Sequence, residues 1–323
     1  MAVRLRNLSN EVRWAIENAG VNPGVLAQKS MVYSSSSAAP YAYWSARGGA
    51  AVDAMYSSLA TAEAALTTGR NDALLLTPEN HSLSATLTWD LNNSHLIGMA
   101  PNGLGFNKRA RIGMSTAFTP MITVSGTGNS FSNIYTMHGT AAGDYIGWTI
   151  SGERNAFAGV HFGGPMAAAQ GGHASYNGVN ITGSECVFNQ CIFGTNTIER
   201  DELTPNVTLG AGTITIFDEC IFTCALTDTD PYFIAVANTS GYTQAYFRKC
   251  QFLAFSANQA NKAAVAFTFS GGSSADMVLD ASCTFAGVTK LAASASMKYI
   301  WAPTVFAATA DELNLIAINS ATY

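Results

Sequence analysis

The sequence predicts an all-β fold, a right-handed parallel β-helix, or solenoid, preceded by a helical arm. A six-residue pattern, Phe-x-x-(Cys/Ile/Val)-x-(Phe/Thr), recurs in the middle of the 323-residue chain at steps of 26 to 31 residues. Each repeat of about 30 residues holds two short strands and cannot bury its own apolar face, so the repeats must stack as coils. Charged residues make up only 11% of the chain, which indicates a largely neutral surface.

The motif positions predict ladders inside the coil. The first position is filled by Phe131, Phe157, Phe188, Phe217 and Phe247. The fourth position is filled by Ile134, Val160, Cys191, Cys220, Cys250 and, in a looser sixth copy, Cys283. Equivalent positions on adjacent coils lie about 4.8 Å apart, so each set is expected to stack in the core. The cysteines share a slot with Ile and Val, which favours free, buried thiols over disulfides.

A second strand closed by a glycine turn precedes several motif copies. It covers residues 122–124, 148–150, 179–181 and 267–269, each followed by Ser-Gly or Thr-Gly. Residues 73–78, 82–88 and 95–99 read as strands of the opening coils.

Helical spacing marks the N-terminal side of the coil. Val52, Met55, Leu59, Ala62 and Leu66 alternate in steps of three and four, which predicts a helix that caps the first coil. Residues 49–290 are therefore expected to hold a capping helix and the solenoid. Residues 291–323 are expected to form a C-terminal cap or an inter-subunit tail.

Residues 1–48 are interpreted as an arm or linker with a short helix over residues 10–19. Arg4, Arg6 and Arg13 give this arm a mild basic bias. Two interpretations stay open for them: a solvated helix face, or a surface that docks on an acidic neighbouring subunit.

Charge and hydropathy exclude several classes of partner. The net charge of −5 and the scattered basic residues form no stripe that would follow a phosphate backbone, so nucleic acid is not an expected ligand. No stretch of about 18 apolar residues predicts a membrane span, and the N-terminus lacks the apolar segment of an export signal. The cysteines and histidines lack metal-ligand spacing, and neither a metal nor a cofactor is expected.

Asp218-Glu219 is the most prominent pair of carboxylates. One coil earlier the equivalent slots hold Asn189-Gln190, and one coil later they hold Arg248-Lys249. Opposite charges on adjacent strands favour a structural ion-pair ladder. A catalytic role is the competing interpretation.

Other acidic residues fall in loops between the motif copies. Asp201, Glu202, Asp228 and Asp230 are the best candidates for a substrate or calcium site, against a simple solvating role. His161 lies inside a motif copy at a position of alternate facing and is expected on the surface.

The layout of a helix followed by coils resembles the pectate-lyase-like right-handed parallel β-helix superfamily over about residues 50–290. That resemblance implies the fold. Lyases of the superfamily use acidic clusters that hold calcium with an Arg or Lys base, and its hydrolases use grouped aspartates. Neither signature is present in this sequence, so no catalytic residue is assigned and the chain is not expected to be an enzyme.

The neutral composition, the arm and the regular solenoid also resemble structural proteins of tailed bacteriophages. This resemblance implies a virion protein assembled in the host cytoplasm, a capsid decoration or cement protein. It would form a homotrimer and bind the major capsid protein across capsomers. The alternative is a tail spike or fibre component that binds or cleaves bacterial surface polysaccharide. A third reading is a bacterial lyase or hydrolase of the same fold.

Overall fold

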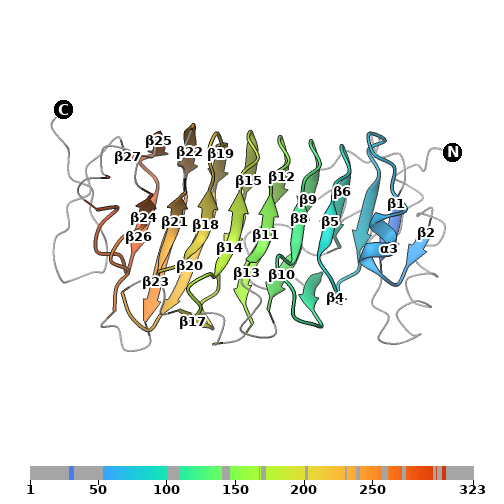
Figure 1. The fold of residues 1–323 in the computed structure, drawn as a ribbon, viewed down its shortest axis with the longest axis horizontal. Coiled ribbons are helices and arrows are strands. Elements are labelled where there is room, and N and C mark those ends of the chain that lie inside the picture. Colours follow the sequence, from blue (N-terminus) through green and yellow to red (C-terminus); the bar gives the residue numbers. More distant parts are fainter. Residues whose placement is uncertain are drawn as a thin grey trace.

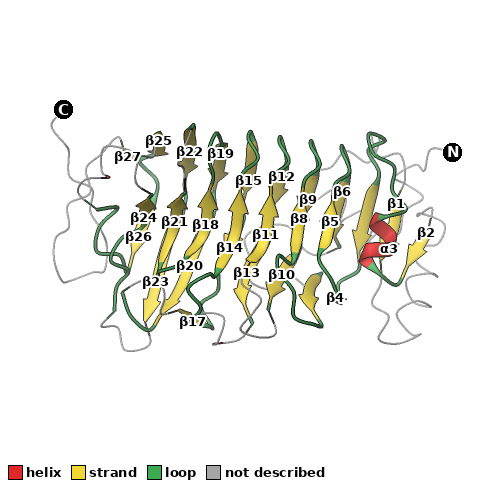
Figure 2. Cartoon of the chain, viewed as in Figure 1, coloured by secondary structure: helices red, strands yellow, loops and turns green. Residues whose placement is uncertain are grey.

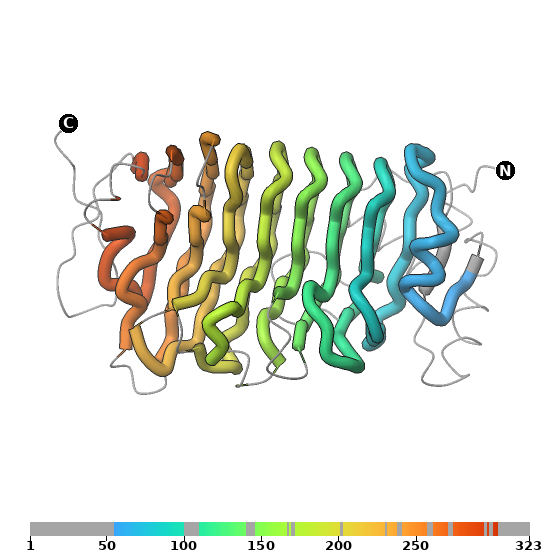
Figure 3. The backbone as a smooth tube through the Cα atoms, viewed as in Figure 1, coloured from blue at the N-terminus to red at the C-terminus, as the bar shows by residue number. Residues whose placement is uncertain are grey.

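The chain folds as an all-β, right-handed parallel solenoid whose coils follow one another along a single axis (Figures 1 and 3). The computed structural model describes residues 29–32, 54–99, 110–139, 146–166, 168, 172–200, 203–229, 231–237, 241–256, 261–270, 274–293, 296 and 300–302. The predicted all-β, right-handed parallel solenoid is confirmed, whereas the helix predicted for the arm over residues 10–19 lies outside the described residues.

Three parallel sheets form the walls of the solenoid. Sheet A has eleven strands in the spatial order β2 (Ala54–Tyr56), β1 (Lys29–Val32), β3 (Ala73–Leu76), β6 (His95–Gly98), β9 (Ser130–Ser132), β12 (Ala156–Ala158), β15 (Cys186–Asn189), β19 (Ile214–Asp218), β22 (Tyr242–Arg248), β25 (Ser274–Leu279) and β27 (Ile300–Trp301).

The other two sheets complete each coil. Sheet B contains β26 (Thr284–Ala286), β23 (Gln251–Ser256), β20 (Ile221–Leu226), β16 (Ile192–Phe193), β13 (His161–Pro165), β10 (Tyr135–His138), β7 (Arg111–Met114) and β4 (Asn80–Leu83), with β17 (Glu199–Arg200) paired to β20. Sheet C contains β24 (Phe267–Phe269), β21 (Tyr232–Val236), β18 (Pro205–Leu209), β14 (Asn177–Ile181), β11 (Ile146–Ile150), β8 (Ile122–Val124) and β5 (Leu87–Trp89).

The six-residue motif bends around a corner, so each complete coil has three strands where the repeat predicts two. The motif begins on sheet A and ends on sheet B, and its middle residues form the turn between them, here named the A–B corner. Gln190, Glu219 and Lys249 occupy equivalent places in this turn with φ values of 51°, 53° and 50°. A residue in this left-handed conformation turns the chain sharply, which separates the strands on either side.

Two stacks of phenylalanine rings fill the core beside the A–B corner. Phe131, Phe157, Phe188, Phe217 and Phe247 stack with ring centroids 4.6 to 5.1 Å apart. The second stack, formed by the last motif residue, holds Phe162, Phe193, Phe222, Phe252 and Phe285 at 4.5 to 4.8 Å. All ten rings are buried. Their spacing follows the strand spacing because each ring comes from the same position of successive coils.

All six cysteines are free and buried. The thiols of Cys191, Cys220, Cys250 and Cys283 each donate to the carbonyl oxygen of a ladder phenylalanine one coil earlier, at 3.3 to 3.5 Å. Burial raises the pKa of the Cys220 thiol well above its ordinary value, and it raises the pKa of Cys186 to about 11. These two thiols therefore stay protonated at neutral pH and act as small apolar side chains.

The expected capping helix over residues 52–66 is wrong in extent. Ala54–Tyr56 forms strand β2 at the end of sheet A, and the helix α3 covers only Leu59–Glu63 (Figure 2). Ser58 caps α3, where its Oγ accepts from the backbone N–H of Thr61 at 3.5 Å. The backbone N–H and C=O groups of β2 form hydrogen bonds with the parallel strand β1. In a helix, the same groups would have formed their hydrogen bonds within the helix. In the described part of the chain, no helix has the length and apolar character needed to cross a membrane.

Candidate functional site

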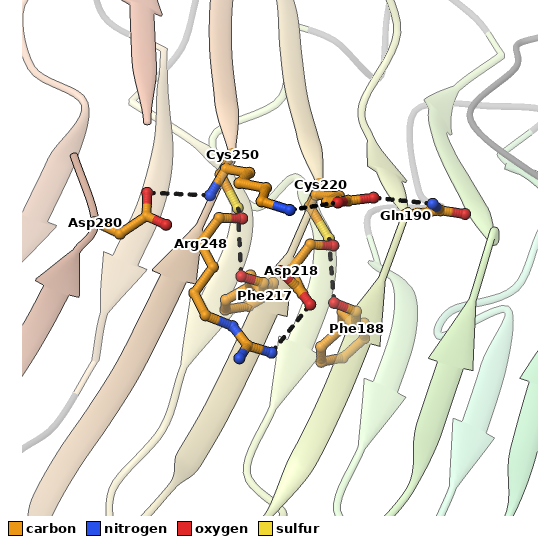
Figure 4. A network of polar contacts seen from close by, with 10 residues as sticks. Phe188, Gln190, Phe217, Asp218, Cys220, Arg248, Cys250 and Asp280 are labelled. Carbon is orange, nitrogen blue, oxygen red and sulfur yellow. Dashed lines mark hydrogen bonds and ion pairs between the residues drawn. The ribbon is translucent and has the colours of Figure 1, made fainter. Parts of the chain in front are cut away.

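The carboxylates of Asp218 and Glu219 form ion pairs with residues of the next coil, and Figure 4 shows the pair of Asp218 and Arg248. An Arg248 Nη lies 3.0 Å from an Asp218 carboxylate oxygen, and Lys249 Nζ lies 3.0 Å from Glu219 Oε1. Gln190, on the preceding coil, donates to the other oxygen of Glu219 at 2.9 Å. Hydrogen bonds from Gln190 and Lys249 hold the pKa of Glu219 below its ordinary value. The pair therefore belongs to an ion-pair ladder on the A–B corner.

Only one of the four predicted loop carboxylates lies within the described residues. Asp228 is half-buried in the turn after β20, and Asp201, Glu202 and Asp230 lie outside the described residues. Among the described residues, no group of three or more His, Cys, Asp or Glu side chains is placed to hold a metal ion. Arg4, Arg6 and Arg13 of the predicted arm also lie outside the described residues.

His161 faces away from the phenylalanine stacks, as its position predicts, but it is buried and not on the surface. Its ring stacks on Tyr135 at a centroid distance of 4.3 Å, and its Nε2 lies 3.0 Å from the carbonyl oxygen of Gly194. The loop that follows β16 therefore covers this part of sheet B, and strand alternation alone does not predict such a cover.

A cluster of apolar side chains, four of them exposed and two half-buried, lies on the outer face of sheet A near its C-terminal end. This cluster, here named the platform, consists of Ile214, Ile216, Tyr242, Tyr246, Val278 and Trp301. Four of the seven large apolar side chains exposed in the described structure belong to it: Ile214, Tyr242, Tyr246 and Trp301. Their strands β19, β22, β25 and β27 are neighbours at the upper left of Figure 1.

Strand register sets the platform in a line. Ile216 pairs with Tyr246, Tyr246 with Val278, and Val278 with Trp301, so these four side chains occupy one outward column. Asp276 lies among the rings, where its Oδ1 accepts from Trp301 Nε1 at 2.7 Å and its Oδ2 accepts from the Tyr242 hydroxyl. Both ring systems are thereby fixed on a flat face of parallel strands.

A pocket of about 410 Å³ lies on the outer side of sheet B. The pocket, here named the loop pocket, is lined by Ala168, Asn196, Thr197, Ile198, Glu199, Ala225, Phe255 and Ser256. Glu199 pairs with Ala225, and Ala225 pairs with Phe255, so these three residues stand in one row across β17, β20 and β23. The small side chain in the middle leaves space between a carboxylate and an aromatic ring.

Sequence reasoning misses both surface features. The motif fixes only inward positions, whereas Tyr246 and Trp301 occupy outward positions that the motif leaves free. The loop pocket depends on β17, an extra strand inside a loop. This strand has only two residues, which are too few to show a periodic pattern in the sequence. Alternation in Tyr242–Arg248, where apolar residues stand on both faces, is the one signal in the sequence that could have indicated the platform.

The sheets and ladders define a protein of the parallel β-solenoid class. Comparisons with known proteins find solved structures of limited similarity. A pectin methylesterase in complex with a hexasaccharide is 15% identical, with a TM-score of 0.49 over 81% of this chain and 80% of that chain. The pectin methylesterase from Aspergillus niger is 12% identical, with a TM-score of 0.43 over 89% and 93%. Tailspike protein 2 of an Escherichia coli O157:H7 bacteriophage is 12% identical, with a TM-score of 0.24 over 68% and 40%.

No protein-family profile matches the chain, and no curated protein does. The expectation that the chain is not an enzyme is contradicted, because similar solved structures are pectin methylesterases and an endo-xylogalacturonan hydrolase. At these identities, and with TM-scores below 0.5, the likeness brings no reaction to this chain. The resemblance to a phage capsid decoration protein receives no support from these comparisons.

Proposed function

We propose that the chain is a structural protein of a tailed-phage virion, a decoration protein that docks on shell subunits through the platform. The observation that carries the proposal is the outward column of Ile216, Tyr246, Val278 and Trp301 on sheet A, in which Tyr246 and Trp301 are exposed and Ile216 and Val278 are half-buried. Tyr and Trp are enriched in the cores of protein interfaces, and charged residues are depleted there. An exposed apolar patch of this kind marks a binding surface on a soluble protein.

The chemistry of the platform specifies its partner. The exposed rings would pack against an apolar protein surface. Asp276, which lies between the rings, carries the single carboxylate on β25. Asp276 already accepts hydrogen bonds from Trp301 and Tyr242, but these neutral donors leave its negative charge uncompensated once the platform is covered. The partner surface should therefore place a basic side chain against Asp276, because a buried charge is costly without an opposite charge. A shell subunit with an apolar patch around one Arg or Lys fits both requirements.

The solenoid suits a stabilising role because its shape is fixed by stacked, internally paired strands. Ligands that bind only the assembled state of a shell stabilise that state by mass action. Contacts that must break before the shell opens also raise the barrier to opening.

A co-sedimentation assay tests the proposal. Shells of the parent phage that lack this chain are mixed with the purified protein and pelleted, and the bound fraction is measured. The double variant Tyr246→Ser, Trp301→Ser should reduce affinity by a hundredfold or more, because buried interface aromatics each contribute about 2 kcal/mol or more. Phe255→Ser, which removes an exposed aromatic outside the platform, is the matched control and should bind as the unaltered chain does.

Equal binding by the double variant and the unaltered chain would refute docking through the platform. Absence of any binding to the shells would refute the decoration role. The alternative role, in a tail spike or fibre that binds or cleaves polysaccharide, stays a prediction.

A further inference from the structure

We propose that the loop pocket binds one ring of a neutral hexose saccharide, which is a binding function separate from docking through the platform. The pocket lies on sheet B and the platform on sheet A, so the two surfaces can be occupied at the same time.

The strand register builds the pocket across three parallel strands. Ala225 is buried and forms the floor, with Glu199 one strand away on one side and Phe255 one strand away on the other. Adjacent strands lie about 4.8 Å apart, so the two walls stand about 9.6 Å apart at the level of the backbone. That width, with a volume of about 410 Å³, accommodates a single pyranose ring.

The lining combines the two kinds of group that a sugar needs. A pyranose presents an apolar face of C–H groups and a rim of hydroxyls. Phe255, 47% exposed, offers the apolar surface. Glu199 and Asn196 offer carboxylate and amide partners for the rim. Glu199 is the one charged residue in the lining, so a neutral sugar that donates hydroxyl protons is favoured over an acidic one.

A buried arginine holds the wall that carries Glu199. Arg200 is 2% exposed, and its Nη1 donates to Asn206 Oδ1 at 3.0 Å while its Nη2 donates to the backbone oxygen and the hydroxyl of Thr204. The guanidinium also lies 4.8 Å from the ring centroid of Tyr176.

Further hydrogen bonds tie this wall to the sheets. The Asn206 side-chain amide donates to the carbonyl oxygens of Phe193 and Thr223, at 2.8 and 2.9 Å. On the other side of the wall, the backbone N–H of Thr197 donates to Thr195 Oγ1 at 3.2 Å. A wall fixed before the ligand arrives loses little conformational entropy on binding, which distinguishes this pocket from a surface loop.

The test is binding of the full chain to immobilised maltohexaose, cellohexaose, mannohexaose and β-1,3-galactohexaose, followed by calorimetry on each positive. The proposal expects binding to at least one of these neutral oligosaccharides. Phe255→Ala should weaken that binding at least tenfold, and Glu199→Gln should weaken it by a smaller factor. Tyr246→Ala, which removes an exposed aromatic from the platform, is the matched control and should leave the affinity unchanged.

Three results would overturn the proposal: no binding to any of the four probes, binding that survives Phe255→Ala, or equal binding of hexagalacturonate, which is acidic. Thermal melting of each variant shows whether it is folded. Saccharide binding and shell binding are measured in different assays, and each assay uses as its control a residue of the other surface, Tyr246 or Phe255. A negative result in one assay therefore leaves the other proposal standing.

Discussion

Phe217 shows most directly how one residue type at one spacing specifies the coil. Its ring lies between Phe188 and Phe247 in the first stack, at 5.1 and 5.0 Å, and it also meets Phe193 and Phe222 of the second stack. The register of this residue can be read from the sequence, because a stack of identical residues recurs at every coil. The outward neighbour Ile216 has no such recurrence, so its place on the platform cannot be read in that way.

Replacing Phe217 by Ala should lower the free energy of unfolding by about 3–5 kcal/mol, because it leaves a cavity between four rings. The measurement is a chemical denaturation curve. Phe255→Ala, at an exposed position, is the control and should change stability by less than about 0.5 kcal/mol. A curve for Phe217→Ala that overlays that of the unaltered chain would show that the core register is wrong.

Glu63 on α3 makes stability depend on pH. Burial, and secondarily the nearby Asp90 carboxylate, raise the pKa of Glu63 to about 7 in the folded chain. The folded state then binds a proton more tightly than the unfolded state does, so stability falls as the pH rises through the window between the ordinary pKa and about 7.

Glu63→Gln should remove this dependence. The melting temperature of the variant should match that of the unaltered chain at pH 4 and exceed it at pH 8. Since Glu63 is only half-buried, the gain should not exceed about 1–2 kcal/mol. Melting curves that differ equally at both pH values would contradict a titrating Glu63 as the cause.

At the scale of elements, the sequence predicts inward strands better than corners and ends. The strand expected at residues 122–124 is β8, and the one expected at residues 267–269 is β24. The sequence predicts two strands per coil and not three because the A–B corner is very short. The six-residue motif spans this corner, so the two strands that it joins look like one. The predicted capping helix is too long because Met55, which lies in the short strand β2, also fits the helical period of Leu59 and Ala62.

Close approach at the turn between sheets C and A explains the recurring Ser-Gly and Thr-Gly. A side chain at Gly152 would collide with the carbonyl oxygen of Gly126 one coil earlier, and one at Gly183 would collide with that of Gly152. Only glycine lets these backbones stack at the spacing of the strands.

Gly152→Ala should therefore destabilise the fold by at least about 2–3 kcal/mol, because the clash is with backbone that cannot move aside. Gly113→Ala is the matched control, since a side chain at Gly113 meets nothing within 4 Å. Thermal melting compares the two. Similar melting temperatures for both variants would contradict the close packing of these turns.

At the scale of the whole molecule, composition predicts a neutral surface but not where it is apolar. The low charge content of 11% leads to the expectation of an oligomer. The structure adds that exposed apolar side chains concentrate on one end of sheet A. The predicted arm and the C-terminal segment lie largely outside the described residues, so their proposed roles as contacts between subunits stay predictions.

The homotrimer expected from the sequence has a direct readout in solution. Mass photometry or sedimentation equilibrium should give three times the chain mass of 33.9 kDa. A single species at 33.9 kDa at micromolar concentration would contradict the trimer and leave docking through the platform as a property of the single chain.

Cryo-electron microscopy of undecorated shells mixed with the purified chain is the most direct test of docking through the platform. Docking predicts regular added density at the junctions between capsomers, with β19, β22, β25 and β27 facing the shell. Unchanged shells, or solenoids whose sheet A faces solvent, would contradict it.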